Sequence, residues 1–262
     1  MPQLQALIFD VDGTLAETER DGHRIAFNRA FAAAGLDWDW SIEQYGELLE
    51  VAGGKERIRF YLDRHVPNFN PPNHWQQDLT AHIADLHRAK TAHYRQLLSE
   101  GIISLRPGVK RLLRQARQAG VRLAIATTSA PDNVLALLST ALAPDAASWF
   151  EVIAAGDIVP AKKPAPDVYC YVLEAMVLKP DNCLVIEDSY QGLQAALQAG
   201  LSTVVTVNNY TQHQDFTGAT LVLNHLGEPD DPFRSIAGNC GAATHFDLAL
   251  AEQLLSQVST MG

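Results

Sequence analysis

The chain has 262 residues, of which 47% are hydrophobic and 19% charged, as is typical of a globular protein with one large domain or two modest ones. Its net charge of −10 argues against nucleic acid as a partner, because phosphate backbones attract basic proteins. The cysteines are widely spaced and form no C-x-x-C pair, and no secretion signal or membrane-length apolar stretch is present, which together predict a reduced, cytoplasmic protein without a membrane partner.

The first predicted element is a strand over residues 6–9, a short apolar run of the kind that is buried on both faces. It leads into Asp10-Val11-Asp12-Gly13-Thr14, where Gly13 suits a tight turn that lets both carboxylates surround one point. Acidic side chains are rarely buried unless they are paired or bind a metal. The pattern therefore predicts a hard cation such as Mg²⁺, with a solvated Asp-x-Asp-Gly turn as the alternative.

Helices dominate the next part of the chain, and no buried strand is predicted between Gly35 and Gly101. The predicted helices cover residues 17–34, 42–51, 56–65 and 75–99. Gly53-Gly54 and the proline-containing residues 67–72 interrupt the helical pattern. We therefore expect an all-helical insertion of modest size.

Strands and helices alternate after this insertion. The predicted strands are residues 122–126, 152–155, 183–186, 202–207 and 221–223, and the predicted helices are residues 109–119, 134–142, 166–176, 190–199 and 246–258. Residues 224–244 are rich in Gly, Pro and Asp and are predicted to be loop. Alternation with fully apolar strands predicts an α/β fold with a doubly wound parallel sheet.

Three of the predicted strands end in polar residues that are useful for chemistry. Asp10 and Asp12 follow the first strand, Thr127 follows the strand 122–126, and Glu187-Asp188 follow the strand 183–186. In a parallel sheet these ends lie at one edge, where ligands bind. Each residue also has a plainer interpretation: Thr127 or Asp188 could cap a helix.

These motifs, together with a Lys163-Pro164 step, resemble those of the haloacid dehalogenase superfamily of phosphatases over the full chain. The resemblance implies an α/β catalytic core made of residues 1–15 and 99–262, and a helical cap domain made of residues 16–98. It also implies an enzyme that hydrolyses phosphoric monoesters with Mg²⁺ as cofactor. Lys162 and Lys163 would otherwise be interpreted as a solvated pair on a loop.

The resemblance assigns a role to each strand-end residue. Asp10 would be the nucleophile that forms an aspartyl-phosphate, and Asp12 the general acid and base. Thr127 and Lys163 would contact the transferring phosphoryl group. The expected metal residues are Asp10, Asp12 through its backbone carbonyl, Asp188 and Glu187, of which Glu187 would hold a metal-bound water.

Within the superfamily, the chain looks most like the branch of β-phosphoglucomutase and the CbbY-like phosphatases. The stretches that carry this likeness are residues 16–19, 36–40, 53–57 and 161–167. The CbbY-like resemblance implies hydrolysis of xylulose 1,5-bisphosphate, an inhibitor of Rubisco in the Calvin cycle. The alternatives are a phosphosugar mutase, a phosphatase of another small ester such as phosphoglycolate, and a non-catalytic sugar-phosphate sensor. A dehalogenase is disfavoured because breaking a carbon–halogen bond does not require Asp12.

A bisphosphate substrate would need cationic groups for its second phosphate. The candidates on the helical insertion are Lys55 and Arg57, beside Gly53-Gly54, with His23 and Lys90 on neighbouring helices. Glu17, Thr128 and Ser129 are the further substrate-binding candidates. The plainer interpretations are surface cations, an acid at a helix start and turn residues. We expect a small phosphorylated sugar as the partner, and no obligate protein partner.

Overall fold

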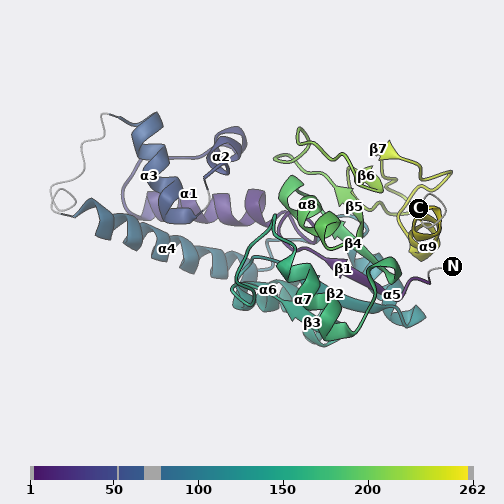
Figure 1. The fold of residues 1–262 in the computed structure, drawn as a ribbon. Coiled ribbons are helices and arrows are strands. Elements are labelled where there is room, and N and C mark those ends of the chain that lie inside the picture. The colour runs from purple at the N-terminus through teal and green to yellow at the C-terminus, as the bar shows by residue number, and fades with distance from the viewer. Residues whose placement is uncertain (1–2, 52, 68–77, 259–262) are drawn as a thin grey trace. The chain divides into compact units, whose positions relative to one another are not determined.

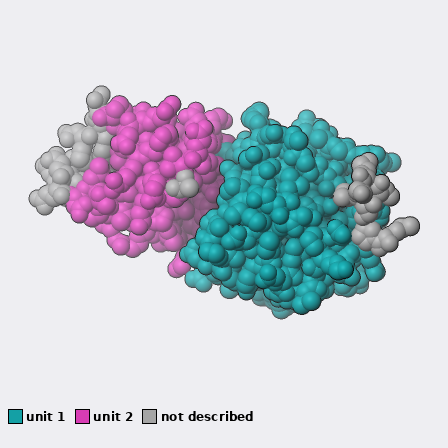
Figure 2. Space-filling view, viewed as in Figure 1, with its two compact units in different colours: residues 1–17, 104–262 teal, residues 18–103 magenta. Residues whose placement is uncertain are grey.

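The computed structural model describes residues 3–51, 53–67 and 78–258, which form two compact units. One unit consists of residues 1–17 and 104–262, and the other of residues 18–103 (Figure 2). The start of the predicted helix 75–99 and most of the proline-containing residues 67–72 lie outside the described residues. Within the described chain, no helix combines the length and apolar character needed to cross a bilayer.

The larger unit is built on a seven-stranded sheet in the order β3-β2-β1-β4-β5-β6-β7 (Figure 1). Its strands are β1 (Ala6–Phe9), β2 (Arg122–Ala126), β3 (Val152–Ala154), β4 (Cys183–Glu187), β5 (Ser202–Thr206), β6 (Leu221–Leu223) and β7 (Ser235–Gly238). The strands from β3 to β6 pair in parallel, with β1 between β2 and β4. The predicted α/β fold with its doubly wound sheet is confirmed for these strands.

The prediction that residues 224–244 are loop is wrong at β7. This strand pairs antiparallel with β6, so the sheet is not wholly parallel. All four β7 residues are exposed, and the strand lies at the edge of the sheet. An edge strand is held by backbone hydrogen bonds, and its side chains need no apolar pattern, so the sequence carries little signal for it.

Helices cover both faces of the sheet. They are α5 (Val109–Ala119), α6 (Pro131–Leu137), α7 (Asp167–Met176), α8 (Tyr190–Gln198) and α9 (Leu248–Val258). Ala6 and Ile8 of β1 share a core cluster with residues of α7 and α8. Leu7 and Phe9 alternate to the opposite face and are equally buried, so β1 is covered on both sides.

The smaller unit contains helices and no strand among its described residues, as predicted. After a π-helical segment (Thr18–His23) come α1 (Arg24–Ala33), α2 (Ile42–Leu48), α3 (Gly54–His65) and α4 (Leu79–Ser99). The predicted helix 17–34 is therefore irregular over its first part. The core of this unit is aromatic: the Trp40 ring packs 4.7 Å from that of Phe27 and 4.8 Å from that of Phe31, measured between centroids.

Candidate active site

Three buried carboxylates converge where β1 and β4 end. The register pairs Phe9 with Ile186, so Asp10 and Glu187 follow side by side, and the amide of Asp10 donates to the Ile186 carbonyl at 3.0 Å. One carboxylate oxygen each from Asp10, Glu187 and Asp188 lies within 4.8 Å of the others. Parallel pairing of adjacent strands thus brings together residues that are far apart in sequence.

Burial dominates the electrostatics of this cluster. It raises the pKa of Asp10 to about 7; the Lys163 ammonium opposes this shift, while Glu187 and Asp12 add to it. Burial, followed by repulsion from Glu187 and Asp10, also raises the pKa of Asp188 well above its ordinary value. A set of buried carboxylate oxygens in mutual repulsion fits a hard divalent cation, because such an ion neutralises the charge and prefers oxygen ligands.

Lys163 supplies a positive charge in direct contact with the cluster. Its Nζ donates to Asp10 Oδ1 at 2.7 Å, to Glu187 Oε1 at 2.5 Å and to the Ala126 carbonyl at 2.9 Å. Burial alone would lower the pKa of Lys163, but the carboxylates of Asp10 and Glu187 outweigh this effect and hold the pKa well above its ordinary value. Lys163 is therefore a fixed positive charge beside Asp10.

Glu187 is surrounded by donors, one of which the sequence analysis missed. The Tyr169 hydroxyl, on α7, donates to Glu187 Oε1 at 2.6 Å, and the amide of Asp188 donates to Oε2 at 3.1 Å. Together with Lys163, these contacts fix both oxygens of the carboxylate. Nothing in the residues around Tyr169 singled it out, because an aromatic side chain at the start of a helix is ordinary core material.

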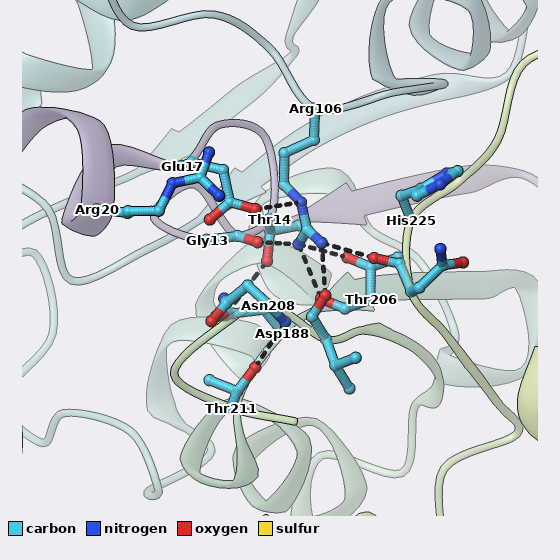
Figure 3. Close-up of polar contacts among 12 residues, drawn as sticks. Gly13, Thr14, Glu17, Arg20, Arg106, Asp188, Thr206, Asn208, Thr211 and His225 are labelled. Atoms are coloured by element: carbon cyan, nitrogen blue, oxygen red, sulfur yellow. Dashed lines mark hydrogen bonds and ion pairs between the residues drawn. The ribbon is translucent and has the colours of Figure 1, made fainter. Parts of the chain in front are cut away.

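Asp188 has two further partners at the same edge of the sheet. Asn208 Nδ2 donates to Asp188 Oδ2 at 2.6 Å, and Thr14 Oγ1 donates to Oδ1 at 3.4 Å. Thr211 Oγ1 accepts from the amide of Asn208 at 3.1 Å, which holds the loop that carries Asn208 (Figure 3). Asn208 follows β5, so the rule that polar strand ends meet at one edge could have found it.

The loop after β2 brings its polar residues to Asp12. Ser129 Oγ donates a short hydrogen bond to Asp12 Oδ2. Thr127 is buried, and its Oγ1 accepts from the amide of Ser129 at 3.2 Å. Thr128 is exposed.

The helix-capping alternatives do not describe this edge of the sheet. The N-cap of α6 is Ala130, and no side chain caps this helix, so Thr127 is not its cap. The N-cap of α8 is Ser189 and not Asp188, because the Ser189 hydroxyl accepts a hydrogen bond from the amide of Gly192.

The cationic candidates of the smaller unit fall into two groups. Lys90 Nζ lies 2.8 Å from His23 Nδ1, and burial, then the charges of Lys90 and Arg57, lower the pKa of His23 well below its ordinary value. Arg57 is buried and donates to the Tyr45 hydroxyl at 2.8 Å and to the Leu48 carbonyl at 3.1 Å, contacts that hold α2 to α3.

Lys55 belongs to a different place in this unit. It lines a pocket of about 680 Å³ together with α4 residues that include His87, Arg88 and Arg95. In the larger unit, Glu17 pairs with Arg106, a residue that the sequence analysis did not single out. The substrate contacts of these residues remain predictions.

Comparison with known proteins gives matches over most of the chain. The sequence matches the haloacid dehalogenase-like hydrolase family over residues 4–200. It is 50% identical over 217 residues to protein CbbY of Rhodobacter capsulatus, which covers 83% of this chain and 91% of that protein. It is 47% identical over 225 residues to protein CbbY of Cereibacter sphaeroides, which covers 86% and 94%.

Two solved structures are also similar to this chain. A variant of CbbY from Rhodobacter sphaeroides in complex with xylulose 1,5-bisphosphate is similar with a TM-score of 0.71 at 46% identity, over 85% of this chain and 95% of that chain. A β-phosphoglucomutase from Clostridium difficile, at 21% identity and a TM-score of 0.60, covers 84% of this chain and 90% of that one. This second likeness shows a common fold.

Proposed function

Because the chain belongs to the haloacid dehalogenase-like hydrolases, we propose that it is a Mg²⁺-dependent phosphatase that converts xylulose 1,5-bisphosphate to xylulose 5-phosphate. The observation that carries the proposal is the buried cluster in which Lys163 contacts both Asp10 and Glu187 beside Asp188. The substrate rests on the similarity to a CbbY that binds this bisphosphate.

The first chemical step uses Asp10 as the nucleophile. One oxygen of its carboxylate bonds to phosphorus while the bond between phosphorus and the sugar oxygen breaks, which gives an aspartyl-phosphate. Asp12 donates a proton to the departing sugar oxygen, and the Ser129 hydroxyl holds the Asp12 carboxyl group in place. Lys163 Nζ, 2.7 Å from Asp10 Oδ1, balances the negative charge that gathers on the phosphoryl oxygens.

The second step returns the enzyme to its starting state. Asp12, now ionised, takes a proton from water as the water oxygen attacks phosphorus, and the bond to Asp10 breaks. Phosphate leaves, and Asp12 is again protonated. The hydroxyl of Thr127, buried at the end of β2, would donate a hydrogen bond to a phosphoryl oxygen.

The carboxylates of Asp10 and Asp188 and the backbone carbonyl of Asp12 would hold Mg²⁺, with Glu187 beside them. The ion supplies charge neutralisation between two anions that must meet, the phosphate ester and the Asp10 carboxylate. Tyr169 and Asn208 keep Glu187 and Asp188 oriented for this task.

The smaller unit is proposed as the cap that takes up the rest of the substrate. Lys90 and Arg57 gather positive charge there, beside His23 whose pKa they lower, and this charge suits a second phosphate. The free cysteines Cys170, Cys183 and Cys240 agree with a reducing cytoplasmic compartment, where we place the enzyme.

The test is phosphate release from xylulose 1,5-bisphosphate with and without Mg²⁺, beside ribulose 1,5-bisphosphate, phosphoglycolate and β-glucose 1-phosphate. We expect selective, Mg²⁺-dependent release from the xylulose compound. Asp10→Asn should lower kcat by at least about three orders of magnitude, because it removes the nucleophile and keeps the shape.

Each other result has a defined meaning. Phosphate release from a different ester agrees with the proposed mechanism and contradicts the assignment of xylulose 1,5-bisphosphate as the substrate. Conversion of β-glucose 1-phosphate to glucose 6-phosphate without phosphate release identifies a mutase. A folded Asp10→Asn protein that retains more than a tenth of the activity contradicts the assignment of the nucleophile.

A further inference from the structure

Arg106 is a nearly buried arginine that joins three segments of the larger unit through backbone carbonyls. Its Nη1 donates to the carbonyl of Gly13, in the loop after β1, and to that of Thr206, at 2.8 Å. Its Nη2 donates to Val207 O at 2.6 Å and to Asn224 O at 2.8 Å, beyond the ends of β5 and β6 (Figure 3). The side chain is only 5% exposed, so these acceptors replace its hydration shell.

The remaining edge of the guanidinium binds a carboxylate. Arg106 Nε lies 3.1 Å from Glu17 Oε1, and Glu17 lies on one side of the guanidinium while Thr206 lies on the other (Figure 3). The Glu17 side chain is 19% exposed, so the pair has a buried cation and a partly accessible anion. The buried Arg106 thus holds the Glu17 carboxylate, while part of the Glu17 side chain stays accessible.

The backbone of the same residue fixes the loop that carries Glu17. The amide of Arg106 donates to the Leu15 carbonyl at 2.9 Å, and the amide of Gly13 donates to the Ala16 carbonyl at 2.8 Å. Only an arginine offers enough donors in a planar fork to bind these carbonyls and a carboxylate at once. Arg106 therefore determines both where the loop after Asp12 runs and where the side chain of Glu17 points.

We propose that Arg106 is a positioning residue that holds the Glu17 carboxylate for the hydroxyl groups of the sugar, and so sets the preference for a polyhydroxylated phosphate ester over a simple one. The inference rests on the proposed function, because Glu17 needs a sugar to recognise. A carboxylate held in one orientation binds hydroxyl groups more tightly than a mobile one, since less freedom is lost on binding.

Arg111 provides a matched comparison within the same unit. Its Nε contacts Glu228 Oε2 at 3.0 Å, and its other nitrogens donate to Phe246 O at 3.0 Å and Gly227 O at 2.7 Å. This guanidinium also joins a carboxylate to carbonyls, and its side chain is 15% exposed. None of these partners belongs to the candidate active site.

The experiment compares two substrates across matched variants. For Arg106→Lys, KM for xylulose 1,5-bisphosphate should rise about 10- to 100-fold with a smaller fall in kcat, because loss of sugar binding is expressed mainly in KM. Hydrolysis of p-nitrophenyl phosphate, which has no sugar hydroxyl, should fall much less than that of xylulose 1,5-bisphosphate, and only through the lost contact of Arg106 with the Gly13 carbonyl. Arg111→Lys should lower the melting temperature and leave the ratio of the two activities unchanged.

Glu17→Gln serves as the second variant, because a buried arginine can also affect folding. It should reproduce the selective loss, and Arg106→Lys added to Glu17→Gln should cost little more than either change alone. Equal loss on both substrates, or additive losses in the double variant, overturns the positioning role. Wild-type protein that hydrolyses p-nitrophenyl phosphate and no sugar phosphate overturns the proposed function itself, and this inference with it.

Discussion

The two compact units bury charge of opposite sign. In the larger unit the charged side chains that cluster at the strand ends are mainly carboxylates, beside Lys163: burial and mutual repulsion raise the pKa of Asp10 and of Asp188. In the smaller unit the buried charged side chains are mainly cations: burial, Lys90 and Arg57 lower the pKa of His23. Burial and neighbouring like charge therefore disfavour the ionised forms of Asp10 and Asp188 in one cluster and of His23 in the other.

This difference indicates what each unit binds. Like charges that are held together away from water are stabilised by a ligand of the opposite sign, and ligands that bind only the folded state raise its stability. A divalent cation suits the carboxylates of the larger unit, and a phosphate group suits the cations of the smaller one. The comparison can be tested by removing charge from one cluster at a time.

The largest effect is expected for Asp188→Asn in the larger unit. The Mg²⁺ concentration for half-maximal activity should rise at least about 100-fold, because a charged ligand becomes neutral. Without metal, the free energy of unfolding should increase, since a carboxylate with a strongly raised pKa is replaced by a neutral amide that Asn208 and Thr14 can still contact. Titration of activity with Mg²⁺ and denaturant unfolding in a chelator measure the two effects.

The matched control for this variant is Asp230→Asn, because Asp230 is an exposed carboxylate of the same unit. It should change neither quantity. A metal-free Asp188→Asn protein that is less stable than wild type would show that this carboxylate stabilises the cluster without a cation, against the comparison.

The second effect is a pH dependence of stability that Mg²⁺ removes. The pKa of Asp10 is about 7 in the folded chain, against an ordinary value of 3.8. The folded state therefore holds this proton more tightly than the unfolded state, and the resulting stability is full below about pH 4 and is lost as the pH rises through 7. In a chelator, the free energy of unfolding should fall over this window by on the order of a few kcal/mol.

Unfolding curves at several pH values, with and without Mg²⁺, measure this loss. Saturating Mg²⁺ should remove most of the slope, since the bound ion favours the ionised carboxylates. The same slope with and without Mg²⁺ would mean that the cluster does not bind the ion.

The sequence was sufficient for the parts of the fold where burial dictates the residue pattern. The strand 122–126 was predicted with the bounds of β2, because an apolar run between Gly120 and polar residues permits little else. The helix predicted over 134–142 begins earlier, at Pro131, which suits a first helical position. β7 could not be predicted, because its four exposed residues carry no apolar pattern.

The candidate site shows the same limit. That Asp10, Glu187 and Asp188 meet follows from strand ends in a parallel sheet and from the family resemblance. Arg106 could not be placed in this way. It stands directly before Pro107-Gly108, which lead into α5, and its contact with Gly13 spans 93 positions. A cation in such a position is ordinarily solvated, and only the folded chain shows that carbonyls surround it.

The smallest effect is expected for Lys90→Met in the smaller unit. The pKa of His23, followed by NMR, should rise, because the nearest positive charge, 2.8 Å from Nδ1, is removed. KM for xylulose 1,5-bisphosphate should rise about tenfold with little change in kcat, since a contact that acts equally on the substrate and the transition state is lost. The free energy of unfolding should stay equal or increase, because an apolar side chain suits the ring faces of Phe27 and Tyr94.

Arg64→Met is the control for this variant, since Arg64 is an exposed cation that lies over the Phe60 ring, 5.9 Å from its centroid, in the same unit. It should leave KM and the pKa of His23 unchanged. If Lys90→Met raises the pKa of His23 without changing KM, the buried cations of this unit do not bind the second phosphate. The contrast between the two units would then be one of internal electrostatics, and the contact with the second phosphate would have to come from other cations, such as those that line the pocket beside Lys55.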